Sequence, residues 1–144
     1  MAITTNAICN SFKKELLEGT HNFKASGGNS FKLSLYTSSA TLGKSTTSFT
    51  SDNQVSNTGQ YASGGSALTS GGTSLSTDTA LVDYADLSFT GVTLTARGAL
   101  IYNDTQTGDP AVCVLNFGGD KTATNGTFTV QFPAFSSSAA IIRI

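Results

Sequence analysis

Apolar and polar residues alternate with a period of two in several segments of the chain, and the first of these is FKLSLYT, residues 31–37. Successive side chains of a strand point to opposite sides, so this period indicates a strand with one buried and one exposed face. We therefore expect a half-buried strand with an inward set and an outward set. The inward set is Phe31, Leu33 and Leu35, and the outward set is Lys32, Ser34 and Tyr36.

The alternation returns at Ala80 and continues to the end of the chain. ALVDYADLSFT, residues 80–90, is followed closely by GVTLTARGALIYN, residues 91–103. In the second segment Val92, Leu94 and Ala96 alternate with Thr93, Thr95 and Arg97. AVCVLNFG, residues 111–118, is nearly continuous in apolar residues, which is typical of a central strand covered on both sides.

Two more strands are expected near the end of the chain. TFTVQFP, residues 127–133, places Phe128, Val130 and Phe132 on one face, and its proline ends the strand. We expect these three side chains to be buried together with Leu115 and Phe117. AAIIRI, residues 139–144, reads as a last short strand. The compositions of NDTQTGDP, residues 103–110, and GGDKTATNG, residues 118–126, predict the intervening loops.

These elements predict an all-β fold. Five or more strands separated by turns every 8 to 12 residues are typical of an antiparallel β-sandwich or a jelly-roll-like barrel. Residues 38–78 are poor in large apolar side chains, so we expect long connections there with short edge strands, one of them around residues 66–68. We expect a single domain, residues 1–144, whose β portion covers about 30–144.

One short N-terminal helix precedes the strands, over about residues 6–18. Asn6 is placed to cap it and Gly19 to end it. Ile8, Phe12 and Leu16 recur on one face, away from the charged residues. This apolar face docks either on the same domain or on a neighbouring subunit.

The charge content argues against several partners. Charged residues make up 12% of the chain and the net charge is −1, with eight scattered Lys and Arg. Nucleic-acid binding needs clustered basic residues, so none is expected. No run approaches 18 apolar residues, so we expect no membrane span. The N-terminus lacks the early basic region and unbroken apolar stretch of a secretory signal.

The two cysteines, Cys9 and Cys113, match no zinc or redox spacing. We expect them to be free and buried as small apolar groups, which is the usual behaviour of cysteine. A disulfide that ties the helix to the sheet is the alternative.

A phosphate-binding loop is not expected. Gly43, Lys44 and Ser45 match the end of a P-loop, but Ser38 stands where the first glycine belongs, and no helix is expected to follow. The loop NQVSNTGQYASGGSAL, residues 53–68, is glycine-rich but also precedes no helix. Its glycines, Gly59, Gly64 and Gly65, are better explained as positions of positive φ in turns.

No catalytic set of residues is apparent either. His21 is the only histidine, and it lies in a loop with no nucleophile elbow nearby, so we expect an exposed or capping side chain. Asp83 and Asp86 are close in sequence, but there is no tryptophan to stack on a sugar. No D-x-D-x-D-G calcium loop is present. We therefore expect no enzyme, no cofactor, no metal, and no catalytic or cofactor-binding residue.

One segment resembles small structural proteins of tailed-bacteriophage virions. It is LYTSSATLGKSTTSFTSDNQVSNTGQYASGGSAL, residues 35–68, in which an LYT strand precedes a polar connection and a glycine motif. The motif positions are Val55, Ser56, Thr58, Gly59, Tyr61, Gly64 and Gly65. The chain departs from the pattern with Gln54 in place of an acid, Asn57 in place of glycine, and an inserted Gln60. The second half of the chain resembles the same kind of protein.

The resemblance implies a non-enzymatic virion protein that is made in the host cytoplasm. Decoration or cementing of the capsid is the first hypothesis, with the major capsid protein or other virion proteins as partners. A tail or fibre component that contacts the host surface or joins tail parts is the second, and a small glycan hydrolase is the third. Phage decoration proteins are commonly trimers, so the resemblance also implies a homo-oligomer with a trimer favoured.

Edge strands support the expected self-association, because an unprotected edge invites pairing with other chains. FKLSLYT and AAIIRI carry few charges that could protect an edge. We expect the contacts to involve residues 1–5 with the following helix, or the C-terminal AIIRI.

Overall fold

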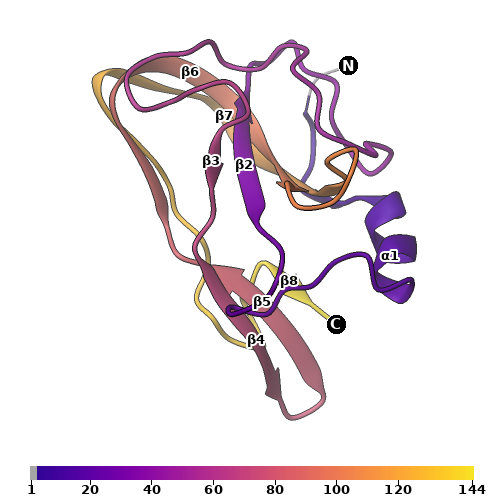
Figure 1. Ribbon diagram of the computed structural model, residues 1–144. Helices are drawn as coiled ribbons and strands as arrows, with labels where there is room; N and C mark the ends of the chain where they lie inside the picture. Colours follow the sequence, from indigo (N-terminus) through magenta and orange to yellow (C-terminus); the bar gives the residue numbers. More distant parts are fainter. Residues whose placement is uncertain (1–2) are drawn as a thin grey trace.

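The computed structural model describes residues 3–144, which form two antiparallel sheets and one short helix (Figure 1). This confirms the predicted all-β class. The larger sheet has the strand order β1-β7-β6-β2-β3, and the smaller sheet has the order β4-β5-β8. The larger sheet consists of β1 (Ala7–Ile8), β7 (Ala111–Val130), β6 (Leu87–Asn103), β2 (Phe31–Tyr36) and β3 (Ser66–Ala67). The smaller one consists of β4 (Ser70–Ser76), β5 (Thr79–Tyr84) and β8 (Ile142–Arg143), and the helix is α1 (Asn10–Leu17).

A long hairpin of β6 and β7 dominates the larger sheet (Figure 1). The two strands pair from Leu87↔Val130 to Tyr102↔Ala111, and residues 104–110 form the predicted turn between them. Residues 118–126, which we expected to be a loop, belong to β7 and pair with β6. That prediction was wrong because β-bulges absorb the turn residues of this segment. Gly118 and Asn125 take positive φ, and the register shifts locally while the pairing continues.

β2 is an interior strand of the larger sheet. It pairs with β6 on one side and with β3 on the other. We expected Ser34 and Tyr36 to face outward, but both are fully buried. The Ser34 hydroxyl donates to the Tyr36 hydroxyl at 3.1 Å, and the Tyr36 hydroxyl donates to the carbonyl of Thr50 at 2.6 Å. The loop that follows β2 thus covers its second face, and the idea that FKLSLYT is an exposed edge is wrong.

The smaller sheet contains a strand that the alternation pattern missed. β4 and β5 form a hairpin that projects from one end of the molecule (Figure 1). β4 is mostly exposed and has only one large apolar residue, Leu75, so it has no apolar stripe to reveal it. The short edge strand expected around residues 66–68 is confirmed as β3, and the expected C-terminal strand is confirmed as β8.

The helix begins four residues later than expected. Ala7 and Ile8 form β1 and pair with Val114 and Cys113 of β7. Asn6 therefore caps no helix, and its side-chain oxygen accepts a hydrogen bond from the backbone N–H of Asn116 at 2.6 Å. Sheet pairing wins here because the apolar residues of this segment can join the edge of β7.

Gly19 ends the helix as predicted. It has a φ of +75°, and its N–H donates to the carbonyl of Leu16. The N–H of Thr20 donates to the carbonyl of Glu15. These two bonds form a Schellman motif, which requires a left-handed residue at the position that Gly19 occupies.

The core is a single cluster that includes the buried face of α1 and both sheets. Phe23 and Phe31 stack with their ring centres 4.4 Å apart. Phe128, Val130 and Phe132 are buried as predicted. Their expected partners, Leu115 and Phe117, are half-buried against the same cluster, and the ring centres of Phe117 and Phe128 lie 6.0 Å apart.

Candidate functional site

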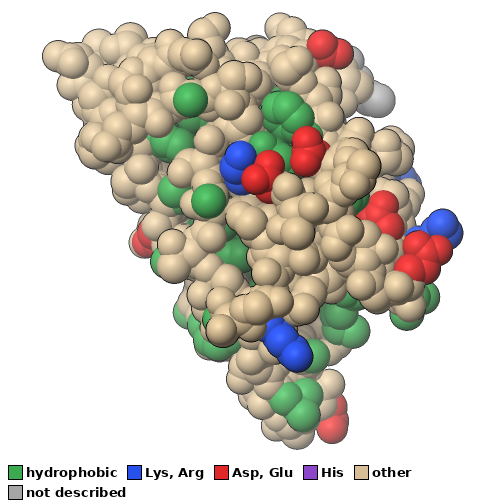
Figure 2. All heavy atoms as spheres, in the orientation of Figure 1, with side chains coloured by type: hydrophobic (Ala, Val, Ile, Leu, Met, Phe, Trp, Pro, Cys, Tyr) green, Lys and Arg blue, Asp and Glu red, His purple; other side chains and the backbone are tan. Residues whose placement is uncertain are grey.

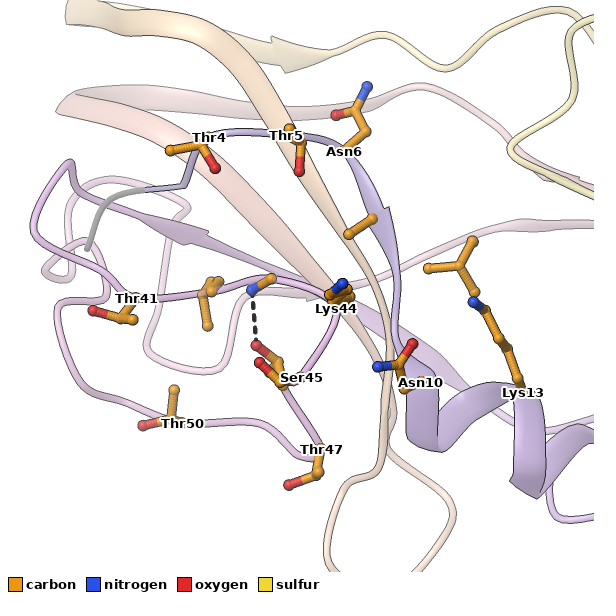
Figure 3. A pocket seen from close by; sticks show the side chains of 15 residues that line it. Thr4, Thr5, Asn6, Asn10, Lys13, Thr41, Lys44, Ser45, Thr47 and Thr50 are labelled. Atoms are coloured by element: carbon orange, nitrogen blue, oxygen red, sulfur yellow. Dashed lines mark hydrogen bonds between the residues drawn. The ribbon is translucent and has the colours of Figure 1, made fainter.

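A depression of about 770 Å³ lies between β1, the start of α1 and the loop 41–50 (Figure 3). Hydroxyl and amide side chains line most of it, and Lys13 and Lys44 are its only charged lining residues. No carboxylate or imidazole belongs to this lining, all of which lies in the described part of the chain. The depression therefore contains neither a pair of carboxylates nor a Ser-His-Asp type of arrangement.

The partial P-loop match lines this depression but does not form a phosphate cradle. The N–H of Gly43 donates to the Thr46 hydroxyl at 3.0 Å, and the N–H of Thr46 donates to the carbonyl of Gly43 at 3.0 Å. A P-loop needs its amides free to face the phosphates and a helix to follow. Here two of the amides close a turn, and the loop 41–50 contains no helix.

The glycine-rich loop 53–65 is a clasp on the larger sheet. Tyr61 is fully buried, and its hydroxyl accepts a hydrogen bond from the N–H of Leu35 at 2.9 Å. Its ring packs edge-on against Phe89, with centres 5.1 Å apart. Burial raises the pKa of the Tyr61 phenol, so it stays protonated and can donate. The loop thereby connects β2 to β6 through one side chain.

Gln54, which stands where the resembled pattern has an acid, is the acceptor of this clasp. Its side-chain oxygen accepts hydrogen bonds from the Tyr61 hydroxyl at 2.9 Å and from the N–H of Gly64 at 2.7 Å. Its amide nitrogen donates to the Ser63 hydroxyl at 3.0 Å. A carboxylate could accept the first two bonds but could not donate to Ser63, whose hydroxyl would have to donate to it instead. The departure from the pattern thus keeps the acceptor and adds a donor.

The glycines of the clasp adopt the positive φ values that we expected. Gly59, Gly64 and Gly65 have φ values of +50°, +92° and +78°. A Cβ on Gly65 would overlap the carbonyl oxygen of Leu33, and one on Gly59 would overlap that of Gly91. These positions need glycine for close backbone approach as well as for φ.

His21 is buried, which corrects the expectation of an exposed or capping side chain. Its ring lies against Phe12, with centres 4.9 Å apart. Nε2 lies 2.7 Å from a carboxylate oxygen of Glu15, and Nδ1 lies 3.0 Å from the amide nitrogen of Asn103. Both ring nitrogens are occupied by these partners, and neither partner is a hydroxyl or thiol that the imidazole could activate. The helix and the apolar run FKLSL lie close to His21 in sequence, but Asn103 is 82 residues away. The local pattern therefore gave no signal for this burial.

Asp83 and Asp86 have separate structural roles. Asp83 is buried, and its Oδ1 accepts a hydrogen bond from the N–H of Tyr84 at 2.9 Å. Burial raises the pKa of the Asp83 carboxyl, against hydrogen bonds from the backbone of Tyr84 and Ile141. Asp86 is exposed and accepts a hydrogen bond from the N–H of Phe132 at 2.8 Å. The pair does not form an acid and base facing a shared substrate cleft.

Cys9 and Cys113 are free and buried, as expected. Burial raises the pKa of the Cys9 thiol to about 11, with a further contribution from Glu15. Burial also raises the pKa of Cys113. Both remain thiols at neutral pH, so neither is an activated nucleophile. No group of three or more potential metal ligands occurs among residues 3–144.

The most distinctive surface is an uncharged face of hydroxyl side chains on the β6–β7 hairpin, which we call the hydroxyl face. Residues 87–96 and 122–130 contain no charged side chain. Figure 2 shows this part of the molecule, at the upper left, without Lys, Arg, Asp or Glu. The exposed members of the hydroxyl face are Ser88, Thr90, Thr93, Thr95, Thr122, Thr124, Thr127 and Thr129.

Cross-strand hydrogen bonds order part of the hydroxyl face. The hydroxyls of Ser88 and Thr129 lie 2.8 Å apart, and those of Thr95 and Thr122 lie 2.9 Å apart. Within each pair, the two residues lie directly opposite each other in the register of the β6–β7 hairpin. The sequence carried a signal for this face, since threonine recurs at every second position in TLTA and in KTAT. Because residues 118–126 were expected to form a loop, the part of the hydroxyl face on β7 was not recognised from the sequence.

Comparisons with known proteins gave no relatives: no family model, no curated protein and no solved structure matches the chain. Within residues 3–144, no helix has the length and apolar character needed to cross a membrane.

Proposed function

We propose that this protein is a non-enzymatic structural protein of a tailed-bacteriophage virion, which decorates or cements the capsid. The observation that carries the proposal is the hydroxyl face, an exposed uncharged surface on the long β6–β7 hairpin. The partner under this proposal is the major capsid protein or another virion protein. The protein is made in the host cytoplasm and joins the particle there as a homo-oligomer, with a trimer favoured by the resemblance.

The chemistry of the hydroxyl face supports a contact with another protein surface. Each hydroxyl can donate and accept, so it fits polar groups of either kind on a partner and can bridge to them through water. Interfaces of this kind are polar and wet at their rims. Because cross-strand bonds already hold part of the face, fewer rotamers are lost when it is covered.

A tail or fibre component is the second candidate, and the β4–β5 hairpin favours it. This hairpin projects from the body (Figure 1), and Leu75 near its tip is 71% exposed. An exposed apolar side chain on a projecting hairpin is suited to contact with a host surface.

Location and copy number in the virion test the proposal. The virions used are those of the phage whose genome encodes this chain. Antibody labelling in electron micrographs gives the location, and quantitative mass spectrometry gives the copy number. We expect labelling over the capsid and hundreds of copies, as decoration requires. A few copies confined to the tail would favour the second candidate, and absence from purified virions, or turnover of bacterial polysaccharide by the purified protein, would contradict both.

Substitutions on the hydroxyl face test the surface itself. Thr124 and Thr127 are exposed, so a Thr124→Lys, Thr127→Lys double variant should fold and yet place two charges on the face. We expect it to be lost from virions in competition with the wild type. Thr107→Lys, in the exposed turn between β6 and β7, is the matched control and should be incorporated normally. Equal incorporation of the double variant would contradict the assignment of the contact to this face.

A further inference from the structure

An apolar groove of about 610 Å³ separates α1 from the C-terminal strand. Its apolar lining comes from both sides, with Phe12 and Leu16 on the helix and Ile142 on β8. Two of its residues are strongly exposed: Leu17 is 91% exposed and Ile144 is 70% exposed. Figure 2 shows hydrophobic side chains at the lower right, where these two elements lie. Exposed apolar surface of this kind marks an interaction site.

The charged side chains that line the groove are both basic. Lys13 and Arg143 are its only charged lining residues, and neither forms an ion pair within residues 3–144. The occupant that fits is therefore an apolar side chain accompanied by a carboxylate.

The helix itself carries that combination. Leu17, its most exposed apolar residue, is followed directly by Glu18, whose side chain is 49% exposed. Glu18 pairs with Lys14 at 3.0 Å, but this surface pair is weak and easily exchanged. When two α1 helices approach in antiparallel orientation, the Leu17–Glu18 end of each meets the Lys13 end of the other. The surface is thus complementary to itself.

We infer that a second copy of this chain covers the groove, with Leu17 of each copy inserted into the groove of the other and Glu18 facing Lys13 there. Contacts of this reciprocal kind are self-closing. They would also cover β8, an edge strand of the smaller sheet that has only Arg143 to protect it. The reciprocal contact has two-fold symmetry and gives a dimer, whereas a trimer would need each Leu17 to enter the groove of the next copy in one direction around a three-fold axis.

The inference deepens the proposed self-association and rests on it, but it does not depend on a role in the virion. It also narrows the expected contact segments to α1 and the C-terminal strand. Of the expected N-terminal segment 1–5, residues 1 and 2 lie outside the described residues, and the groove lining contains none of residues 3–5.

Sedimentation equilibrium of the full chain over micromolar to submillimolar concentration tests the contact. We expect the wild type to form a dimer through the reciprocal contact and Leu17→Asp to weaken its association by at least about tenfold, as for a central interface residue. Leu75→Asp, at a leucine on the β4–β5 hairpin that is 71% exposed and outside the groove lining, is the control and should associate like the wild type. Circular dichroism melts establish that each variant is folded.

A charge exchange adds a test that misfolding cannot imitate. Lys13→Glu alone and Glu18→Lys alone should each weaken association, and the double exchange should restore it, because the opposite charges again face each other across the contact. A monomeric wild type, or association unchanged in Leu17→Asp, would overturn the inference. A monomer found in hundreds of copies on capsids would overturn this contact and leave the proposed decoration role standing. An oligomer that depends on the groove but is absent from virions would contradict the decoration role and leave this contact standing.

Discussion

Nε2 of His21 donates a hydrogen bond to the carboxylate of Glu15 across 2.7 Å, in a site where the imidazole side chain is fully buried. The direction follows from the other ring nitrogen. Nδ1 lies 3.0 Å from the amide nitrogen of Asn103, which can only donate, so Nδ1 accepts and the proton is on Nε2. The orientation of Asn103 is consistent with this, since its oxygen accepts from the N–H of Thr105. The imidazole therefore links α1 to β6.

Replacing His21 should remove this link, so that the Glu15 carboxylate and one N–H of the Asn103 amide lose their hydrogen-bond partner. We expect His21→Ala to lower the free energy of unfolding by about 2–3 kcal/mol, the cost of unsatisfied buried polar groups. Lys14→Ala breaks the exposed Lys14–Glu18 pair instead and should cost under about 0.5 kcal/mol. Guanidinium melts measure both. Equal small losses would mean that the buried network contributes little.

Gly65 and Gly108 form a matched pair, because both have positive φ but only one is crowded. A Cβ on Gly65 would overlap the carbonyl of Leu33, whereas nothing lies within 4 Å of a Cβ on Gly108. We expect Gly108→Ala to cost roughly 1 kcal/mol for the left-handed backbone alone. Gly65→Ala should cost at least about 3 kcal/mol, because the backbone must also move to relieve the overlap. Denaturant melts that give equal costs would show that the clasp is not closely packed on β2.

Phe128 tests the inward face of β7. It is 7% exposed and packs near Phe117, so Phe128→Ala should lower the free energy of unfolding by about 3–5 kcal/mol through lost burial and the cavity left behind. Phe135, which is 47% exposed, provides the control, and its replacement by alanine should cost under about 1 kcal/mol. A Phe128→Ala loss below that of Phe135→Ala in urea melts would mean that the face is wrongly assigned.

The thiols should be inert in the folded protein. With the pKa of Cys9 raised to about 11 and that of Cys113 raised by burial, neither should react with Ellman's reagent at about pH 8 until the protein is denatured. Cys9→Ser and Cys113→Ser should each change stability without changing its response to reductant. A melting midpoint of the wild type that falls on addition of reductant would instead indicate a disulfide.

Asp83 should make stability depend on pH. Its pKa in the folded protein is raised above the ordinary value of 3.8, chiefly by burial, so the folded state binds the proton more tightly than the unfolded state. The free energy of unfolding should therefore fall as the pH rises from about 4 through the raised pKa of the folded carboxyl. Asp83→Asn keeps a polar group of similar size but cannot ionise. In melts at several pH values, this variant should lose that slope, and an unchanged slope would assign it to another group.

Much of the fold could be predicted from the sequence because the relevant signals are local. The period of two in residues 31–36, 92–97 and 127–132 sets which side chains share a face of a strand, so these strands and the inward position of Phe128 were expected correctly. Gly19 ends the helix because only its own backbone must turn left-handed. The scarcity of charge in residues 87–96, on which the hydroxyl face depends, is likewise a property of the sequence itself.

Only the tertiary structure decided which of these surfaces are covered. Ser34 and Tyr36 are buried because the loop after β2 folds back over them, and His21 is buried because β6 brings Asn103 beside it. Residues 118–126 are a strand because β6 offers them a pairing partner. Leu17 and Ile144 share one groove although they stand at opposite ends of the chain. Each of these outcomes depends on contacts between residues distant in sequence, whereas a local pattern of apolar and polar residues records only what a side chain prefers and carries no information about which segment will reach it.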